Sequence, residues 1–472
     1  MPNDFDVAVI GSGFGGSLMA MIARQLGRSV ILIERGRHPR FAIGESSTPL
    51  ANLLLEEVAR EYRLDALLPL TKWGTWQATH PELACGLKRG FSFYHHQLGK
   101  QWQPDELRRN ELLVAASPHD RIADTHWYRP DVDHFFVREA QRLGAEFVDR
   151  TELNAIEFVG SSVKISGPKF SASVGFVVDA SGPRGFLDRA LTLPEVDFEK
   201  FPVTQALYTH FENVERWKNL PCYSGGETPY PVDDAAVHHI FPGGWIWVLR
   251  FNNGLTSAGV ATTNDVSGGA KSWARLLTLL PSVQEQFARA KPVLPFFHMP
   301  KVAFRAARAV SLRWAMLPSA AGSIDPLLST GFPLTLWGVK RLAKVMEENW
   351  PESALREYER ITLMELDRAA GLVAKLYANF EEFEKFCAFS MSYFAAASYA
   401  EAARRLNRSE KAPTFLAGVD QPIQTINVAG LADLARQNWY PCRAEDLLEN
   451  CSKLGASRDE VREMLGRTGF SE

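Results

Sequence analysis

The chain has few of the features that mark membrane, secreted or nucleic-acid-binding proteins. No stretch approaches the roughly 20 consecutive apolar residues of a membrane-spanning helix. Met1–Asp4 lead directly into an apolar run, so we expect no signal peptide. The net charge of −3 argues against a nucleic-acid-binding surface.

Cysteine is scarce and irregularly placed. The 5 cysteines are scattered without C-x-x-C spacing, which predicts neither a disulfide framework nor a zinc site and fits a reducing cytoplasm. The adjacent His95 and His96 would face opposite sides of a strand, which is poor geometry for a shared metal, so we interpret them as structural. We therefore expect a cytoplasmic protein without a metal.

The first part of the chain carries a nucleotide-binding pattern. Residues 5–34 read as a strand, a glycine turn, a helix and a second strand. Gly11, Gly13 and Gly16 give the spacing G-x-G-x-x-G, which allows a tight turn, a close approach to a pyrophosphate and close helix–strand packing. Glu34 ends the second strand, where a carboxylate can accept from ribose hydroxyls. The alternative is a βαβ unit whose turn binds nothing.

Two later segments have both a structural and a chemical interpretation. Residues 45–48 precede a helix that begins near Leu50, and on chemistry alone they cap it. Lys88 stands before an aromatic strand. A lone lysine is usually a solvated surface charge, whereas a lysine desolvated beside a flavin would have a lowered pKa and a free amine.

The middle of the chain predicts a cover and a second turn near the nucleotide. Residues 101–130 are charged and irregular, which indicates a mobile cover over a site. Residues 131–144 predict an amphipathic helix that ends at Gly144. The sequence DASG at 179–182 follows a strand, where it either brings backbone close to the first βαβ unit or forms a plain β-turn.

Residues 201–300 predict strands without intervening helices. Trp245 and Trp247 alternate with apolar residues, so both indoles should face the same side, as core or as the wall of an aromatic pocket. Asn253–Gly254 predicts a hairpin turn. We expect an antiparallel sheet over the nucleotide domain.

The last third predicts helices. Ser329, Thr330 and Gly331 precede a helix with Pro333 in its first turn, where N–H groups either bind an anion or are capped. Residues 346–472 read as a helical packing subdomain. The expected division is a nucleotide domain (1–200 and 301–345), a sheet domain (201–300) with 73–130 contributing to the site cover, and the C-terminal helices.

Together these motifs resemble the flavin-dependent halogenase family, which includes tryptophan, pyrrole and phenol halogenases. The resemblance covers about residues 5–400 by position along the chain. GSGFGG with Glu34 is similar to the FAD turn of the family, GESSTP to its loop beside the flavin, and CGLKRGFSF to its lysine segment. DASG resembles the second FAD motif, WIWVLR the W-x-W-x-I-P signature, and IDPLLSTG the D-P-x-x-S-T-G loop.

The resemblance implies a fold and a reaction. The fold is α/β, with a Rossmann-like FAD domain of the glutathione-reductase and p-hydroxybenzoate-hydroxylase type, an antiparallel substrate sheet and C-terminal helices. FAD, reduced by a separate NAD(P)H flavin reductase, would use O2 and chloride or bromide to give hypohalous acid. The acid would pass through a tunnel to Lys88 and halogenate a phenol, pyrrole or indole, free or tethered to a carrier protein. The protein would be a monomer or homodimer.

The resemblance also assigns site residues. Lys88 is the catalytic lysine, and Trp245 with Trp247 forms the substrate wall. The halide would lie at Ser329, Thr330 and Gly331. The cofactor residues are Gly11, Gly13, Phe14, Gly15, Gly16, Glu34, Arg35, Glu45, Ser46, Asp179, Gly182, Asp325 and Pro326.

Three positions depart from the family pattern. Leu249–Arg250 replace the isoleucine and proline of the signature, and Leu328 stands where tryptophan halogenases carry a glutamate, which argues against free tryptophan as substrate. Pro318–Ser319 replace the usual Gly-Asp, which removes a charge-assisted hydrogen bond worth about 1.5–3 kcal/mol if buried. The alternatives are therefore a flavin monooxygenase or dehydrogenase of the same fold, in which Lys88 is dispensable, or an inert flavoprotein.

Overall fold

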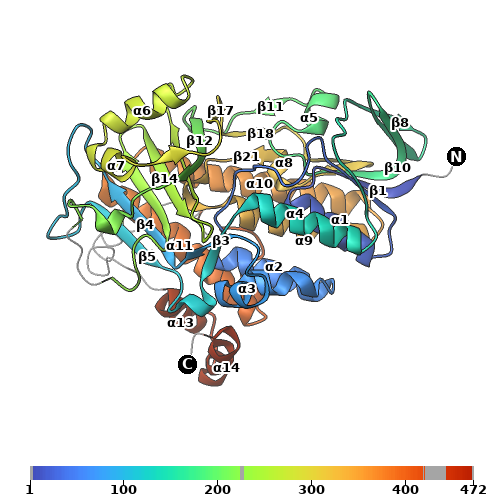
Figure 1. Ribbon diagram of the computed structural model, residues 1–472. Helices are drawn as coiled ribbons and strands as arrows, with labels where there is room; N and C mark the ends of the chain where they lie inside the picture. The colour runs from blue at the N-terminus through green and yellow to red at the C-terminus, as the bar shows by residue number, and fades with distance from the viewer. Residues whose placement is uncertain (1–3, 224–227, 418, 420–442, 470–472) are drawn as a thin grey trace.

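The computed structural model describes residues 4–223, 228–417, 419 and 443–469, and it is built around two large sheets (Figure 1). One sheet carries the glycine motif and lies on the right in Figure 1, and the other lies on the left. This arrangement confirms the predicted α/β architecture with a second, mainly antiparallel sheet.

The nucleotide-binding sheet has the order β19-β20-β10-β1-β2-β7, with β9 and β8 added beside β10. Its inner strands are parallel, and the β2 sequence VILI is buried throughout, as expected for a strand covered on both faces. Its strands are β1 (Phe5–Ile10), β2 (Val30–Ile33), β7 (Glu146–Val148), β8 (Ala155–Val159), β9 (Ser162–Gly167), β10 (Phe170–Asp179), β19 (Val310–Ser311) and β20 (Trp314–Met316).

Helices α1 (Phe14–Gln25), α4 (Arg129–Arg142) and α9 (Gly331–Glu347) accompany this sheet. α1 packs against both α4 and α9. Gly144 follows α4 with φ +91°, so the predicted end of this helix is confirmed. Residues from three distant parts of the chain thus surround the glycine turn.

The second sheet has the order β16-β12-β15-β14-β13-β4-β5, with β17 also paired to β12. All of its pairs are antiparallel except β13–β4. The predicted hairpin at Asn253–Gly254 is confirmed, since Gly254 has φ +83° between β14 and β15. The strands are β4 (Gly90–His95), β5 (Glu111–Ala115), β12 (Gln205–Glu212), β13 (Ala236–Phe241), β14 (Gly244–Arg250), β15 (Thr256–Thr262), β16 (Lys291–Pro292) and β17 (Phe297–Met299).

The prediction that residues 201–300 contain no helices was wrong. α6 (Ala270–Thr278) and α7 (Pro281–Gln286) pack beside this sheet, and Trp273 and Leu277 of α6 are buried in its second apolar cluster. The helices are short, so their few apolar residues gave too little periodicity to be recognised.

The prediction that residues 101–130 are irregular was wrong for residues 111–127, while their role as a site cover stays a prediction. The segment contains β5, whose sequence ELLVA is buried, and β6 (Asp124–Trp127), which pairs with β3 (Cys85–Lys88). The polar residues of β6 are buried because they bond to the 45–52 segment: Asn52 Nδ2 donates to Asp124 Oδ1 (2.9 Å) and Trp127 N donates to the Glu45 carbonyl (2.6 Å). Their polarity had suggested exposure.

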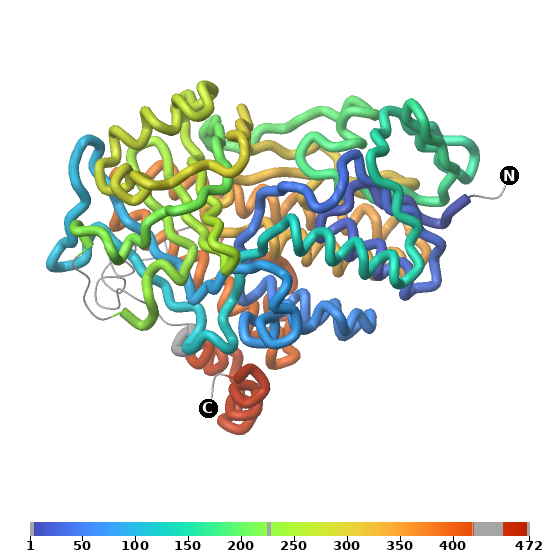
Figure 2. The backbone as a smooth tube through the Cα atoms, viewed as in Figure 1, coloured from blue at the N-terminus to red at the C-terminus, as the bar shows by residue number. Residues whose placement is uncertain are grey.

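The C-terminal helices cover the remaining side of both sheets. α11 lies against β4, where Phe386 and Phe394 pack on Phe93 and Phe91 at ring distances of 5.5 and 5.1 Å. Figure 2 shows the last helices, in red, at the lower edge of the molecule. The helices here and beside α9 are α2 (Pro49–Glu61), α3 (Trp73–Thr79), α8 (Pro318–Ala321), α10 (Glu352–Tyr377), α11 (Phe383–Arg405), α13 (Arg443–Lys453) and α14 (Arg458–Thr468).

The remaining elements are short. They are α5 (Phe186–Ala190), the strands β11 (Glu195–Val196), β18 (Phe304–Ala306) and β21 (Gly322–Ser323) of a small sheet, and the 3-10 turns η1 (Asp65–Thr71), η2 (Asp120–Ile122), η3 (Trp217–Asn219), η4 (Pro326–Leu328) and η5 (Ser409–Lys411). In the part of the chain that the structure describes, no helix is long and apolar enough to cross a membrane.

Candidate active site

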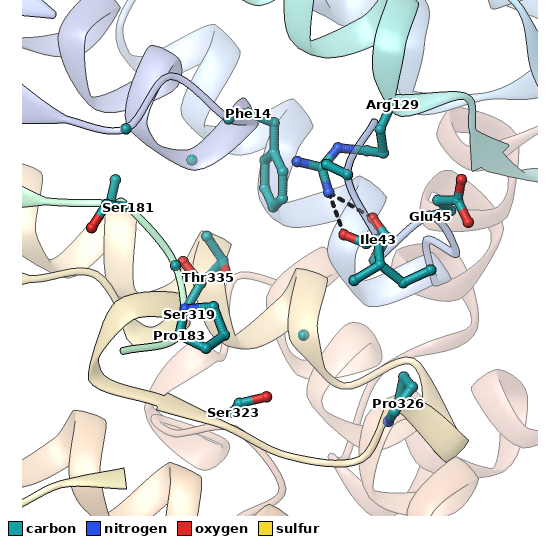
Figure 3. Close-up of a pocket in the computed structure, with 18 of the residues that line it drawn as sticks. Phe14, Ile43, Glu45, Arg129, Ser181, Pro183, Ser319, Ser323, Pro326 and Thr335 are labelled. Carbon is teal, nitrogen blue, oxygen red and sulfur yellow. Dashed lines mark hydrogen bonds between the residues drawn. The ribbon is translucent and has the colours of Figure 1, made fainter. Parts of the chain in front are cut away.

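A cavity of about 600 Å³ lies between the two sheets and the N-terminus of α9 (Figure 3). Most of the predicted site residues line it. They are Gly11, Gly13, Phe14, Gly15, Gly16, Glu34, Arg35, Glu45, Ser46, Gly182, Trp245, Trp247, Pro326, Ser329, Thr330 and Gly331. Asp179, Asp325 and Lys88 do not line it.

The glycine turn is a cradle that side chains would fill. Gly11 has φ +94°, and a Cβ on Gly11 would lie 2.5 Å from the Ala180 carbonyl oxygen. A Cβ on Gly16 would lie 2.0 Å from the Gly11 carbonyl oxygen. α1 begins here without a side-chain cap, so its first-turn N–H groups suit the negative charge of a pyrophosphate. The turn therefore fits a dinucleotide such as FAD.

Glu34 is ionised and already ordered by the chain. Its carboxylate accepts from the N–H groups of Ser12 (3.1 Å) and Gly36 (2.9 Å) and from Arg40 (3.2 Å). Burial opposes ionisation, but Arg40 and the two N–H groups outweigh it and lower the pKa of Glu34. The carboxylate fixes the shape of the glycine turn, while its bond to a ribose stays a prediction.

An arginine clamp that the sequence analysis missed holds the loop across the cavity. Arg129 donates to the carbonyl oxygens of Ile43 (3.0 Å) and Gly44 (2.8 Å), as Figure 3 shows. It also pairs with Asp133 through two bonds of 2.8 Å, one turn along α4. The guanidinium lies 5.1 Å from the centre of the Phe14 ring. The i, i+4 spacing of Arg129 and Asp133 was visible in the sequence, but nothing showed that the pair is buried.

Asp179 and Asp325 act on loops rather than on the cavity. Asp179 accepts from Ser181 N (2.8 Å) and Leu187 N (2.7 Å), which fixes the DASG turn. Asp325 accepts from Trp245 Nε1 (3.0 Å) and from the Tyr377 hydroxyl (2.6 Å). Burial raises the pKa of Asp325 to about 6, against the effect of these donors. Both carboxylates, predicted as cofactor contacts, are satisfied by the chain itself.

Pro318–Ser319, the departure from the usual Gly-Asp, also line the cavity. Ser319 and Ser323 supply hydroxyls there, and Figure 3 shows both beside the cavity. Hydroxyls can bond to a ribityl chain without a carboxylate, although neutral hydrogen bonds are weaker than charge-assisted ones. The site therefore still fits a flavin.

The 329–331 segment forms an open helix start. Ser329 is left-handed at φ +54°, and α9 begins at Gly331 after Thr330, whose side chain makes no capping bond. The cap that we weighed as an alternative is therefore not made by Thr330. The uncapped first turn of a 17-residue helix faces the cavity with unused N–H groups.

The two tryptophans lie on one face of β14, as predicted. Their ring centres are 5.5 Å apart, and both side chains are buried while lining the cavity. Trp245 is held by Asp325, and Trp247 Nε1 donates to Ser257 Oγ (3.3 Å). They form a rigid wall between the cavity and the second sheet.

Lys88 is fully buried although it stands outside this cavity. Its Nζ donates to the Ser47 carbonyl oxygen (2.6 Å) and lies 3.9 Å from the centre of the Phe91 ring. Its exposed fraction is 0%. Burial lowers the pKa of Lys88 to about 7, and the charge of Asp124 partly opposes this shift. The amine is thus available in both protonation states near neutral pH.

A second, smaller cavity of about 50 Å³ lies beside residues that Lys88 contacts. Residues 45–50 connect the two: Glu45 and Ser46 line the first cavity, Ser47 bonds Lys88, and residues 48–50 line the second. Phe91 also lines the second cavity. Lys88 itself lines neither cavity, but it contacts Phe91, which lines the second, and Ser47, which directly follows two residues that line the first.

The shifted pKa of Lys88 gives a pH-dependent stability. Between pH 7 and about 10.5 the unfolded chain holds a proton on Lys88 that the folded protein has lost, so unfolding becomes less favourable as the pH rises. Lys88→Met has no such proton. We expect the free energy of unfolding of the wild type to rise relative to Lys88→Met by up to about 1.4 kcal/mol per pH unit. Urea unfolding of both proteins at pH 7, 8 and 9 measures this difference, and a constant difference would contradict a lowered pKa.

The Glu45 carboxylate is also bonded within the chain, although it lines the large cavity. Its Oε1 accepts from His210 Nε2 (2.7 Å), and both side chains are at most 1% exposed. The pair anchors the GESSTP loop on β12, while Thr48 caps α2 by accepting from Ala51 N (3.3 Å). The capping interpretation was therefore correct for Thr48, and the loop residues before it face the cavity and Lys88.

Metal ligands are absent from the site in the described residues. Among these residues no group of three His, Cys, Asp or Glu side chains is placed to hold an ion. His95 stacks on Phe383 and His96 bonds His239 (3.0 Å), so the two histidines face opposite sides as predicted. Cys85, Cys222, Cys387 and Cys451 are free, and Cys442 lies outside the described residues.

We compared the chain with a family profile, with related proteins and with solved structures. The profile of the FAD dependent oxidoreductase family matches residues 6–306. The monodechloroaminopyrrolnitrin halogenase PrnC of Pseudomonas fluorescens is 28% identical over 408 residues, which are 82% of this chain and 70% of that protein. The tetracycline 7-halogenase of Kitasatospora aureofaciens is 28% identical over 346 residues. The match covers 70% of this chain and 61% of that protein.

Among solved structures, a point mutant of the halogenase PltM in complex with FAD superposes with a TM-score of 0.80. The match covers 99% of this chain and 96% of that chain at 24% identity, so it supports the fold alone. The named relatives confirm the resemblance that the motifs indicated.

Proposed function

This chain belongs to the FAD dependent oxidoreductase family, and from that premise we propose that it is a flavin-dependent halogenase of electron-rich aromatic rings. A separate NAD(P)H flavin reductase supplies its reduced FAD. The observation that carries the proposal is the buried amine of Lys88, held beside the cavity with the glycine cradle and a second, aromatic cavity. In a monooxygenase or dehydrogenase of this fold, Lys88 would be dispensable.

The large cavity would hold FAD. The glycine turn and the first turn of α1 would take the pyrophosphate, and Ser319 and Ser323 would offer hydroxyls to the ribityl chain. Reduced FAD supplies two electrons, so that O2, a halide ion and one proton give hypohalous acid and water. Trp245 and Trp247 close this cavity toward the second sheet and keep water from the oxidant.

The halide binds at the start of α9, where backbone N–H groups of Thr330 and Gly331 are uncapped. A Cβ on Gly331 would meet no atom within 4 Å, so alanine fits the fold but narrows the halide site. We expect Gly331→Ala to raise the KM for bromide roughly 10- to 100-fold, since a weakened charge-assisted bond costs about 1.5–3 kcal/mol. Initial rates measured over a range of bromide concentrations give this KM.

Gly371→Ala is the matched control for this variant, because Gly371 lies in α10 and an added Cβ there also meets nothing within 4 Å. Its KM for bromide should equal that of the wild type. Equal KM values for Gly331→Ala and the wild type would move the halide to another site.

The aromatic substrate approaches Lys88 from the second cavity. The cavity is lined by Phe91, Tyr393 and Phe394, with few polar groups at its edge. Leu328, where tryptophan halogenases carry a glutamate, is fully buried and offers no partner for an amino acid substrate. At about 50 Å³ the cavity is smaller than a phenol or indole ring, so a phenol, pyrrole or indole, either free or carried by a carrier protein, would enter only as these walls move apart.

The proposal is tested by mass spectrometry of reaction mixtures. Purified protein, a flavin reductase, FAD, NADH and bromide or chloride are incubated with phenols, pyrroles and indoles, each free and as a carrier-protein thioester. A halide-dependent isotope pattern in one product supports the proposal. A hydroxylated product formed without halide would favour the monooxygenase, and absence of O2 consumption with reduced FAD would favour an inert flavoprotein.

A further inference from the structure

His238 is a buried histidine that no motif singled out. It lies on β13, it is 2% exposed, and it lines the large cavity next to Trp245, with ring centres 5.1 Å apart. On its other sides it stacks on Phe93 (4.7 Å) and Phe91 (5.8 Å). Phe91 is the ring over which the Lys88 amine lies.

These contacts form a continuous row between the two cavities. Trp245 and His238 line the first cavity, Phe91 lines the second, and the Lys88 Nζ is 3.9 Å from the Phe91 ring centre. Trp245 and Phe91 carry no side-chain hydrogen-bond acceptor, so the His238 imidazole is the first group of the row, counted from the large cavity, that can accept a hydrogen bond. The His238 ring therefore lies where the large cavity comes within one aromatic side chain, Phe91, of Lys88.

The chemistry of His238 is fixed by its neighbours. The short contact of Nδ1 with the Ala236 carbonyl oxygen (2.9 Å) requires a proton on Nδ1, which assigns the lone pair to Nε2. Burial and the charge of Lys88 lower the pKa of His238 to about 3, so the ring is neutral at working pH. A neutral imidazole with a fixed tautomer is an acceptor for an acidic O–H.

We propose that His238 is a relay residue whose Nε2 accepts the O–H of hypohalous acid and holds it in line for Lys88. The inference rests on the proposed halogenase function. Lys88 then takes the halogen as an N-haloamine, in which the Lys88 amine and hypohalous acid give Lys–NHX and water, or directs the acid itself to the ring. In both routes His238 keeps the oxidant from returning to the flavin cavity and to bulk water.

The test compares His238→Phe with His238→Gln. Phenylalanine fills the aromatic row but accepts no hydrogen bond, whereas glutamine retains an acceptor. During turnover with bromide we measure brominated product per reduced FAD oxidised, and free hypobromous acid trapped by a scavenger in bulk solution. We expect His238→Phe to lose at least tenfold in product per FAD, with more trapped acid and FAD oxidation within threefold of the wild type. His238→Gln should recover to within threefold of the wild type.

His239→Phe is the matched control. His239 is the next residue of β13, equally buried, with a pKa that burial also lowers to about 3, but it faces the second apolar cluster and bonds His96 and Gln286. Its product yield per FAD should equal that of the wild type. A loss as large as that of His238→Phe, or unchanged yield in His238→Phe, would overturn the relay.

A second measurement separates the relay from the halogenase proposal, because it needs neither FAD nor turnover. The FAD-free proteins are treated with limiting hypobromous acid, and modification of Lys88 is compared with that of exposed lysines by peptide mass spectrometry. We expect the ratio to fall at least tenfold in His238→Phe and to recover in His238→Gln. Equal ratios in all proteins would overturn the relay, even if the wild type halogenates.

Discussion

We expect Lys88→Ala to bind FAD within about threefold of the wild type and to form about a thousandfold less halogenated product. The loss follows from removing the one amine beside the two cavities, since a positioned acid–base or nucleophilic group contributes about 10²- to 10⁴-fold. FAD binding is spared because Lys88 does not line the flavin cavity. Product per reduced FAD, from mass spectrometry, and fluorescence titration of FAD measure the two effects.

Two further variants make this result specific. Lys88→Met keeps most of the side-chain volume under the Phe91 ring, so its activity should be as low as that of Lys88→Ala if the amine is what matters. Lys100→Ala removes an exposed lysine that bonds only to Gln97 in the described structure and should leave activity unchanged. Equal hydroxylated product from wild type and Lys88→Ala would instead support a monooxygenase.

The parts of the site that could be predicted from the sequence are those in which short-range geometry determines the role. The spacing of Gly11 and Gly16 encodes a turn whose glycines are required by contacts within the same βαβ unit and with the DASG turn. The alternation of Trp245 and Trp247 encodes a shared face because the side-chain period of a strand is two. Both patterns are read from local spacing alone, although the DASG turn that the glycines meet lies far along the chain.

The parts that could not be predicted depend on which distant segments meet. Asp325 was expected to contact the cofactor, but it bonds Trp245, 80 residues earlier in the chain, and Tyr377. His238 and His239 are adjacent and chemically identical. Only the large cavity on one face of β13, and the second apolar cluster on the other, separate a cavity residue from a core residue. Residues 124–127 are polar because they bond the 45–52 segment, which no local pattern shows.

The same reasoning explains how the signature departures are accommodated. Arg250, at the position of the family proline, donates to the Val214 carbonyl oxygen (3.0 Å) and lies 3.5 Å from Asp233. Its own carbonyl oxygen would lie 1.9 Å from a Cβ on Gly86, so the end of β14 presses against the strand that carries Lys88. Cys85 N and Asn252 Oδ1 (3.1 Å) tie the same two segments together. The departure thus leaves the lysine strand anchored.

The second large effect concerns Gly16. A Cβ at this position would lie 2.0 Å from the Gly11 carbonyl oxygen and 2.9 Å from the Ala180 side chain, and the first of these neighbours is backbone that cannot rotate away. We expect Gly16→Ala to push α1 away from β1, at a cost of about 1–3 kcal/mol in the free energy of unfolding. The displaced first turn of α1 no longer meets the pyrophosphate, so the Kd for FAD should rise roughly 10- to 100-fold.

Gly466→Ala provides the reference for this change, because Gly466 lies in α14 and an added Cβ there meets nothing within 4 Å. Alanine is a better helix former than glycine by about 1 kcal/mol, so this variant should be as stable as the wild type or slightly more stable. FAD titration measures the Kd for FAD, and urea unfolding measures the free energy of unfolding, of both variants. If Gly16→Ala bound FAD as tightly as Gly466→Ala, the pyrophosphate would not lie on the glycine turn. FAD would then have to lie in the cavity in the opposite orientation, or the cavity would not be the FAD site.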